Sequence, residues 1–321
     1  MTEKLVEIQN LSVHFKIGRR DTLYAVQDMT VDIFKGETLG LVGESGSGKT
    51  TAGRVIKNII KPTAGRVLFE GRDIHTMKGA EKKAYTKRAQ MIFQDPYSSL
   101  DPRMTVREIV KEGMRAHRMH TEEEMNRKAL EFIEMVGLTK EQARRFPHEF
   151  SAGQRQRIGI ARAMAVNPEF VVCDEPTSAL DVSIQAQIIT LLKDLQKLLG
   201  LTYLFISHDL SVVKYVSDRV AVMYLGEIVE IAPSRHLFAS PRHPYTISLI
   251  SSIQIPDPRI ERSRSKIRLR GDMHSAINLA REGCKFTPRC PYVHSECGTL
   301  TTSLVPIAED HFCACPFVRA E

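Results

Sequence analysis

The chain has 321 residues, with 42% hydrophobic and 26% charged residues, which are ordinary values for a globular protein with a large core. No apolar run approaches the ~18 residues that a membrane-spanning helix needs. The opening residues alternate as in a strand and lack the hydrophobic stretch of a signal peptide. These features exclude a membrane-spanning class, and we expect a cytosolic chain that meets a membrane only through a partner.

The net charge of +7 is partly concentrated in one segment, where basic residues alternate with Ser, Ile and Leu. The simplest interpretation is a solvated linker. Contact with anionic headgroups or nucleic acid is the alternative, because clustered positive charge attracts either. The basic residues of this segment are Arg259, Arg262, Arg264, Lys266, Arg268 and Arg270.

Strand and helix signals alternate through about the first 250 residues, which predicts an α/β fold with a largely parallel sheet. Pro and Gly end the first helix, and Gly200 closes the last long one. In chain order, the predicted elements are a strand at 38–42, a helix over 49–60, a helix over about 152–166, a strand at 170–173, a helix over 182–199 and a strand at 203–206.

Two further regions depart from this alternation. Residues 105–119 and 121–136 are charged and helical in pattern with no strand between them, which predicts a helical subdomain over about 95–150. After about residue 240 the chain becomes rich in proline and loop-like. We therefore expect an α/β domain over 1–250 and a C-terminal extension over 251–321.

A glycine-rich sequence at 43–50 fits the phosphate-binding pattern G-x-x-x-x-G-K-[ST]. Its glycines let backbone N–H groups approach phosphate oxygens closely, and the following helix directs its positive end at the same anion. In such a loop Lys49 bridges the β- and γ-phosphates, and the Thr50 hydroxyl is a Mg²⁺ ligand. The loop therefore predicts binding of ATP with Mg²⁺.

Two adjacent carboxylates, Asp174 and Glu175, follow the apolar strand at 170–173. We expect Asp174 to hold Mg²⁺ through water. Glu175 is the better candidate for the catalytic base, because a carboxylate beside the phosphate can accept a proton from the attacking water. The pair predicts ATP hydrolysis.

Six motifs occur in one fixed order, and together they resemble the ATPase subunit of an ABC transporter from about residue 4 to the C-terminus. They are the loop at 43–50, Gln94, the sequence 151–154, the strand and acidic pair at 170–175, the sequence 178–181 and His208. This resemblance implies an ABC-type nucleotide-binding domain with a helical subdomain. It also implies that two ATPase subunits close around two ATP molecules.

The resemblance assigns further roles by position. Gln94 reaches Mg²⁺ and the attacking water, and His208 contacts the γ-phosphate. Ser151 opens the signature helix, whose amides bind ATP held by the opposite subunit, although Ala152 stands where the common form has glycine. Phe15 occupies the place of the adenine-stacking aromatic, with Tyr24 as the alternative.

The predicted site falls into three groups of residues. The catalytic group is Glu175, His208 and Gln94. The nucleotide-binding group is Phe15, Gly43, Ser45, Gly46, Ser47, Gly48, Lys49, Thr50, Thr51, Gln94, Ser151, Gly153, Gln154, Asp174 and Asp181. The Mg²⁺ group is Thr50, Gln94 and Asp174.

Three stretches, at 94–103, 240–246 and 283–291, resemble the dipeptide and oligopeptide importer branch of the family. The branch implies a paralogous ATPase, two transmembrane permease subunits and an extracytoplasmic solute-binding protein, at the cytoplasmic face of the membrane. It does not name the solute, since nickel, glutathione and some sugar importers share this ATPase type. The alternative is a soluble ABC ATPase acting on nucleic acid or ribosomes; for the importer, no nucleic-acid partner is expected.

Five of the six cysteines lie in the last 38 residues, whereas Cys173 lies in an apolar run and is expected in the core. Structural disulfides are rare in a reducing cytosol, which favours a metal site. The C-x₅-C-x₆-C spacing from Cys284 to Cys297 does not fit the C-x₂-C pairs of common zinc sites. Thiolates on loops suit a [4Fe–4S] cluster, which the branch resemblance also implies.

The fourth cluster ligand has two candidates, Cys313 and Cys315. The family's ending resembles His-x-x-x-Cys, which matches His311 and Cys315, and Pro316 follows Cys315 as Pro291 follows Cys290. We therefore expect Cys315 to be the ligand. The predicted set is Cys284, Cys290, Cys297 and Cys315, with a zinc site or reduced thiols as the alternatives.

Overall fold

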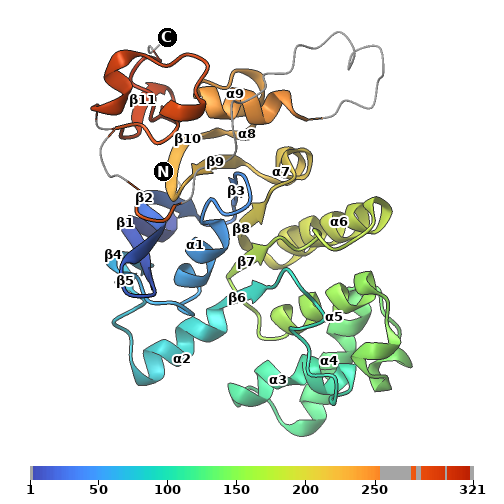
Figure 1. Cartoon of the computed structure of the whole chain (residues 1–321). Helices are drawn as coiled ribbons and strands as arrows, with labels where there is room; N and C mark the ends of the chain where they lie inside the picture. Colours follow the sequence, from blue (N-terminus) through green and yellow to red (C-terminus); the bar gives the residue numbers. More distant parts are fainter. Residues whose placement is uncertain (1–2, 254–275, 280–282, 301, 319–321) are drawn as a thin grey trace, which may run out of the picture.

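The computed structural model describes residues 3–253, 276–279, 283–300 and 302–318. An eight-stranded sheet runs through the molecule in the order β11-β12-β10-β9-β3-β8-β7-β6 (Figure 1). Strands β9, β3, β8, β7 and β6 are parallel, and β10, β12 and β11 continue the sheet antiparallel. The strands are β3 (Thr38–Val42), β6 (Ala89–Ile92), β7 (Phe170–Asp174), β8 (Thr202–Ser207), β9 (Arg219–Tyr224), β10 (Glu227–Pro233), β11 (Val305–Ala308) and β12 (His311–Cys313).

The central strands are covered on both faces. Every residue of β3, β7 and β8 is buried, which explains their continuous apolar sequences. Cys173 lies in β7 and is fully buried, as expected, and burial raises the pKa of its thiol. The sequence therefore identified the centre of this α/β fold correctly.

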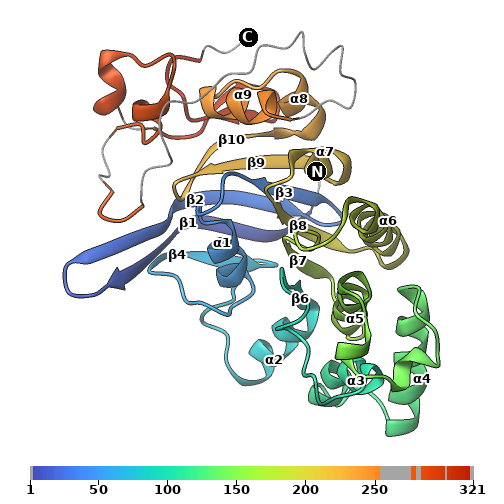
Figure 2. The ribbon, with the colours of Figure 1, turned by 45° about the vertical axis from the view of Figure 1, so that its right-hand side comes forward.

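A second, antiparallel sheet packs near the N-terminus. It consists of β2 (Asp21–Phe34), β1 (Lys4–Ile17), β4 (Ala64–Phe69) and β5 (Arg72–Asp73), in that order. Its buried side chains share one core with helices α1 (Lys49–Ile56) and α2 (Gly79–Arg88) and with the central sheet. The β1–β2 hairpin extends away from the rest of the chain (Figure 2).

A group of helices lies at one end of the molecule, beyond β6 and β7 (Figures 1 and 2). It contains helices α3 (Val106–Ala116), α4 (Glu122–Met135) and α5 (Ala152–Met164) and the short turns η1 (Gln142–Arg144) and η2 (Pro147–Glu149). All residues from 93 to 169 are described, and none of them forms a strand. The prediction of two helices without an intervening strand is confirmed.

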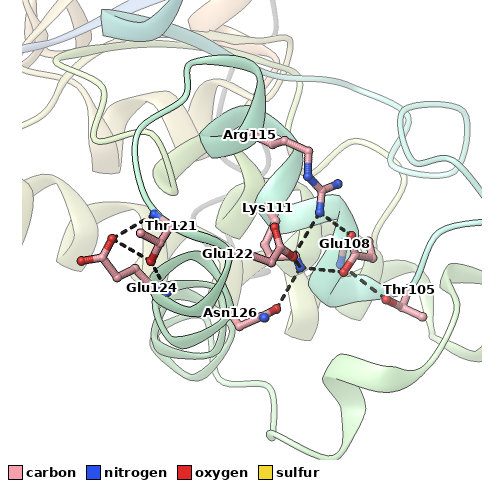
Figure 3. Close-up of polar contacts among 8 residues, drawn as sticks. All are labelled: Thr105, Glu108, Lys111, Arg115, Thr121, Glu122, Glu124 and Asn126. Carbon is pink, nitrogen blue, oxygen red and sulfur yellow. Dashed lines mark hydrogen bonds and ion pairs between the residues drawn. The ribbon is translucent and has the colours of Figure 1, made fainter.

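A buried lysine ties α3 to α4 (Figure 3). Lys111 is only 2% exposed, and its Nζ donates to Asn126 Oδ1 at 2.8 Å and pairs with Glu108 and Glu122. Because an unpaired buried charge is costly, these partners favour one packing of α3 on α4. At the start of α4, Thr121 and Glu124 form a reciprocal capping box.

Two predictions about helices need correction. Helix α1 ends at Ile56 rather than residue 60, because Asn58 adopts a left-handed conformation with φ of 60°. The chain after residue 240 is not all loop, because residues 244–251 form a helix. Pro244 suits the first helical position, and the fully buried Tyr245 anchors this helix. The helices beyond β7 are α6 (Val182–Leu199), α7 (Leu210–Val216), α8 (Ser234–Ala239) and α9 (Pro244–Ser251).

The described part of the C-terminal segment is joined to the central sheet. Strand β12 pairs with β10, and the turns η3 (Thr287–Arg289) and η4 (Ser295–Gly298) precede it. The buried carboxylate of Glu230 in β10 accepts hydrogen bonds from the backbone N–H groups of Arg242 and His243, both at 2.8 Å. It also contacts His311 Nε2 at 2.7 Å. One carboxylate thus links β10, β12 and the start of α9.

Two remaining observations concern the membrane and the basic stretch. Within the described ranges, no helix combines the length and the apolar content needed to cross a bilayer. The six basic residues between 259 and 270 lie outside the described residues.

Candidate functional site: a nucleotide cavity and a thiol cavity

The glycine-rich loop at 43–50 connects β3 to α1 and lies against the neighbouring backbone. A Cβ atom at Gly43 would stand 2.1 Å from the carbonyl oxygen of Met223, and one at Gly48 would stand 2.0 Å from that of Ala25. Both glycines also have positive φ, 155° and 104°. No other residue type fits this backbone without a shift.

Lys49 is 4% exposed and is held by the start of its own loop. Its Nζ donates to the carbonyl oxygens of Gly43 at 2.8 Å and Glu44 at 2.9 Å, and lies 3.3 Å from Ser47 Oγ. Burial lowers the pKa of Lys49, while the nearby carboxylates of Glu175 and Asp174 oppose that shift. The Lys49 ammonium group is therefore held by carbonyl oxygens near the N-terminus of α1.

Two oxygen-bearing side chains meet beside the loop. Thr50 Oγ1 donates to Asp174 Oδ1 at 2.8 Å. Asp174 ends β7 and is 2% exposed, and burial raises its pKa against the opposing effect of the Thr50 hydrogen bond. A hydroxyl and a carboxylate are ligands that Mg²⁺ accepts.

The Glu175 carboxylate lies between Gln94 and His208. Gln94 Nε2 donates to Glu175 Oε2 at 3.0 Å, and His208 Nδ1 lies 3.2 Å from Glu175 Oε1. The three residues follow the adjacent parallel strands β6, β7 and β8. Because the carboxyl ends of parallel strands meet at one edge of a sheet, residues far apart in sequence converge there.

These groups surround a cavity of about 580 Å³. Its lining includes nine predicted site residues, together with two residues of β2, Leu23 and Ala25, that the sequence did not single out. The lining residues are Leu23, Ala25, Ser45, Gly46, Gly48, Lys49, Thr50, Thr51, Gln94, Glu175 and His208. The β2 residues carry no motif; only the fold brings them to the loop.

Other predicted residues lie away from this lining. Ser151 is the N-cap of α5, where its hydroxyl accepts from the Gln154 N–H at 3.3 Å, in the group of helices beyond β6 and β7. Asp181 is the exposed N-cap of α6. Phe15 faces Leu23 across the β1–β2 ladder but is not among the lining residues.

The four predicted cluster cysteines line a second, smaller cavity of about 210 Å³. They are Cys284, Cys290, Cys297 and Cys315, and Phe286 and Phe317 form part of the wall. Cys313 is buried outside this lining, where its Sγ accepts from the Cys315 N–H at 3.5 Å. Cys284 is tied to Cys297 through a backbone hydrogen bond of 2.8 Å.

Burial raises the pKa of three thiols of this cavity, those of Cys284, Cys290 and Cys315. Backbone hydrogen bonds oppose this rise, and neighbouring thiols add to it. In the part of the chain that the structure describes, no three His, Cys, Asp or Glu side chains are placed to hold a single metal ion. The four cysteines thus share one cavity lining.

Comparison with known proteins agrees with this geometry. Residues 26–178 match the ABC transporter family, and residues 229–297 match the oligopeptide/dipeptide transporter C-terminal region. The chain is 56% identical over 276 residues to the oligopeptide transport ATP-binding protein OppF of Bacillus subtilis, covering 85% of this chain and 90% of that protein. It is 54% identical to the dipeptide transport ATP-binding protein DppF of Lactococcus lactis, over 83% of this chain and 87% of that one.

A solved structure extends the comparison to the fold. The ATP-binding cassette MJ0796, in a dimeric post-hydrolysis state bound to ADP and Pi, is 30% identical with a TM-score of 0.66, covering 72% of this chain and 99% of that one. The chain therefore belongs to the ABC transporter family, among its oligopeptide/dipeptide transport ATP-binding proteins. It is an ABC ATPase, and the resemblance predicted from the six ordered motifs is confirmed.

Proposed function

We propose that this chain is the ATP-hydrolysing subunit of an importer for dipeptides or oligopeptides. The observation that carries the proposal is the convergence of Lys49, Glu175 and His208 on one cavity beside the phosphate loop. The C-terminal match to the oligopeptide/dipeptide transporter region favours the importer over a soluble ABC ATPase acting on nucleic acid or ribosomes.

Different side chains around the cavity are suited to binding phosphate and to binding Mg²⁺. Lys49 binds the β- and γ-phosphates, and the loop amides and the start of α1 hold the phosphate oxygens. Thr50, Gln94 and Asp174 hold Mg²⁺, which neutralises charge on the phosphate oxygens when bound. The Thr50–Asp174 contact of 2.8 Å supports this ligand set, because it places two suitable oxygens together.

Glu175 is the proposed base, which accepts a proton from the attacking water. Its carboxylate is oriented by Gln94 on one side and His208 on the other. His208 has a 57% exposed side chain, so it remains accessible to a γ-phosphate. Because Glu175 lies outside the 43–50 loop, its replacement should stop ATP hydrolysis without removing the groups that bind the phosphates.

The residues outside the cavity are proposed to act on the nucleotide of a second ATPase chain. Ser151, Gly153 and Gln154 stand at the N-terminus of α5, and the positive end of a helix is an arrangement that binds anions. Asp181, the exposed N-cap of α6, is proposed to belong to the same dimer face. The adenine is proposed to pack near Phe15 on the β1–β2 hairpin.

We propose that residues 1–250 form the nucleotide-binding domain, with its helical subdomain at about 95–150, and that residues 251–321 form a cysteine-rich extension. The partners are a paralogous ATPase, two transmembrane permease subunits and, indirectly, an extracytoplasmic solute-binding protein. The chain then works peripherally at the cytoplasmic face of the membrane. The names of the relatives, oligopeptide and dipeptide transport ATP-binding proteins, support membrane permease partners.

Uptake of labelled peptides tests the function. A strain lacking the gene should lose uptake of dipeptides or oligopeptides, wild-type protein should restore it, and Glu175→Gln should not. Tagged chain should also co-purify with membrane proteins. Unchanged peptide uptake in the deletion strain would contradict the proposal, as would nucleic-acid binding with a steep salt dependence in a filter assay.

We further propose that Cys284, Cys290, Cys297 and Cys315 hold a [4Fe–4S] cluster. The lining of one cavity by these four thiols and two phenylalanine rings supports this ligand set, while Cys313 lies outside the lining. Bound there, the cluster would supply four cross-links that clamp the C-terminal extension. Anaerobically purified protein should be brown, contain about four irons per chain and bleach with dithionite. Colourless protein with stoichiometric zinc would contradict the cluster.

A further inference from the structure

The C-terminal segment reaches into the phosphate loop through Arg289. Its guanidinium forms a two-pronged ion pair with Glu44, with Nη1–Oε2 at 2.8 Å and Nη2–Oε1 at 3.1 Å. Glu44 is the residue after Gly43 in the loop, and Arg289 lies between two of the cluster cysteines in sequence. The pair therefore joins two sites that are 245 residues apart in the chain.

Glu44 is held at three points. Its carboxylate meets Arg289, its backbone N–H donates to Tyr245 Oη at 2.9 Å, and its carbonyl oxygen accepts from Lys49 Nζ at 2.9 Å. Two of these three anchors come from residues beyond 240, and the third is the lysine proposed to bind phosphate. The orientation of the Glu44 peptide thus depends on elements outside the phosphate motif.

The side chains that carry these anchors are firmly packed. Arg289 has an 8% exposed side chain and lies over the Tyr224 ring at 5.9 Å. Phe286, three residues earlier, is 1% exposed and packs against Tyr224 and Tyr245 at centroid distances of 5.3 and 5.5 Å. Because the Arg289 side chain is packed against these rings, its ion pair with Glu44 has less freedom to rearrange than an ion pair on the surface.

We propose that Arg289, supported by Tyr245, is a positioning residue for the phosphate loop, so that the Arg289–Glu44 ion pair sets the affinity of the nucleotide site. Arg289 acts through Glu44 and touches neither phosphate nor Mg²⁺. The inference deepens the proposed function and rests on it, because it treats the 43–50 loop as the ATP site. A chain in which Glu44 is released from Arg289 should bind ATP more weakly.

The structure offers a matched control in the same segment. Lys285 is also buried and basic, with a 3% exposed side chain, and it pairs with Glu227 of β10 rather than with the phosphate loop. Replacing either Lys285 or Arg289 by Met removes one buried cation and leaves one carboxylate without that partner. Only the Arg289 change releases Glu44.

The experiment measures binding of a fluorescent ATP analogue to the full-length chain, with iron content and thermal stability recorded for each variant. Arg289→Met should raise the Kd about tenfold, which corresponds to about 1.4 kcal/mol, whereas Lys285→Met should leave the Kd within about twofold. Arg289→Lys should recover part of the affinity, because a lysine keeps the charge but not the two-pronged geometry. In the assembled ATPase, the KM for ATP should rise more than kcat falls.

Equal effects of the two Met variants, or no effect of either, would overturn the inference, because the Kd would then not depend on Glu44. Failure of the wild-type chain to bind the analogue would instead contradict the proposed function. Hydrogen exchange on wild-type protein provides a test that needs no variant. By reciprocity of coupling, ATP should slow exchange in residues 283–300. Unchanged exchange there on saturation with ATP would also overturn the inference.

Discussion

The nucleotide cavity and the thiol cavity are built in opposite ways. The first collects residues from the ends of parallel strands, where the position of a residue after its strand fixes its place in space. The second collects cysteines from turns and loops around η3, η4 and the end of β12. A site of the first kind depends on the sheet, whereas a site of the second kind depends on packing and on whatever its thiols bind.

This difference predicts different responses to mutation. A single change in the nucleotide cavity should remove one chemical step and leave the backbone intact, because the β-sheet holds the remaining residues. A single change in the thiol cavity should affect the order of the whole segment, since few backbone ladders hold it.

The largest effect is expected for Glu175→Gln. Removal of the proposed base should lower ATP turnover by at least about a hundredfold, while ATP binding and thermal stability remain near wild-type values. The glutamine still fits between Gln94 and His208, so the local contacts are largely retained. Turnover is measured in the assembled ATPase, and binding is measured on the isolated chain.

Lys49→Ala is the matched comparison within the same cavity, and it should weaken ATP binding itself. Glu175→Gln with turnover near wild type would show that the assigned base is wrong. Loss of thermal stability in Glu175→Gln as great as that in a cysteine variant would contradict the contrast between the two cavities.

The next effect concerns the two neighbouring cysteines at the end of the chain. Cys315→Ser should lose most of the iron and lower the thermal stability of the protein, because Cys315 lines the thiol cavity. Cys313→Ser should retain the iron, because Cys313 is buried outside the lining. Iron is quantified per chain after anaerobic purification of both variants. The opposite pattern would make Cys313 the fourth ligand.

The same contrast explains what the sequence could predict. The nucleotide residues could be assigned because a loop after a strand has a local signature, and strands β3, β7 and β8 lie at the predicted positions. The helix α9 was missed, because Pro244 suggested a loop. The burial of Tyr245 stabilises the helix instead. Local patterns do not report such tertiary contacts.

Long-range pairings account for the remaining differences. No sequence rule indicated that His311 would meet Glu230, or that β12 would extend the central sheet. Arg289 and Glu44 lie 245 residues apart, and neither belongs to a motif that names the other. Four of the five C-terminal cysteines, by contrast, line one cavity, and the crowding of all five near the C-terminus was visible in the sequence.

A smaller effect is expected for Asp174→Asn, which should change the thermal stability of the nucleotide-free chain by an amount that depends on pH. Burial raises the pKa of Asp174, so the folded state binds a proton more readily than the unfolded state, and its stability falls as pH rises through that pKa. At neutral pH the nucleotide-free variant should therefore be more stable than wild type, and the difference should shrink as the pH is lowered. Thermal unfolding across a pH series measures it.

Addition of MgATP should make the wild-type chain more stable than Asp174→Asn, the reverse of the order without nucleotide. At about 100 times its Kd, MgATP should stabilise the wild-type chain by about 2.7 kcal/mol. Asp174→Asn should gain from ATP but show little further gain from Mg²⁺, because it has lost a proposed ligand of the ion. An equal Mg²⁺-dependent gain in both proteins would remove Asp174 from the Mg²⁺ site.

The smallest change in stability is expected for Ser151→Ala, which removes the N-cap of α5. Loss of a serine cap should lower the free energy of unfolding by about 1 kcal/mol. Thr121→Ala is a matched control, because Thr121 caps α4 through the same reciprocal arrangement, with Glu124 in place of Gln154 (Figure 3). The two variants should therefore be equally destabilised in denaturant unfolding.

Their activities should differ, since only Ser151 is proposed to contact the ATP of a partner chain. Ser151→Ala should lower turnover of the assembled ATPase well beyond its small loss of stability, while Thr121→Ala should retain nearly full turnover. Binding of ATP to the isolated chain should be unchanged in both, because neither residue lines the nucleotide cavity. If the two variants lose turnover equally, Ser151 acts as a helix cap alone, and the nucleotide site is completed by other residues of the second chain.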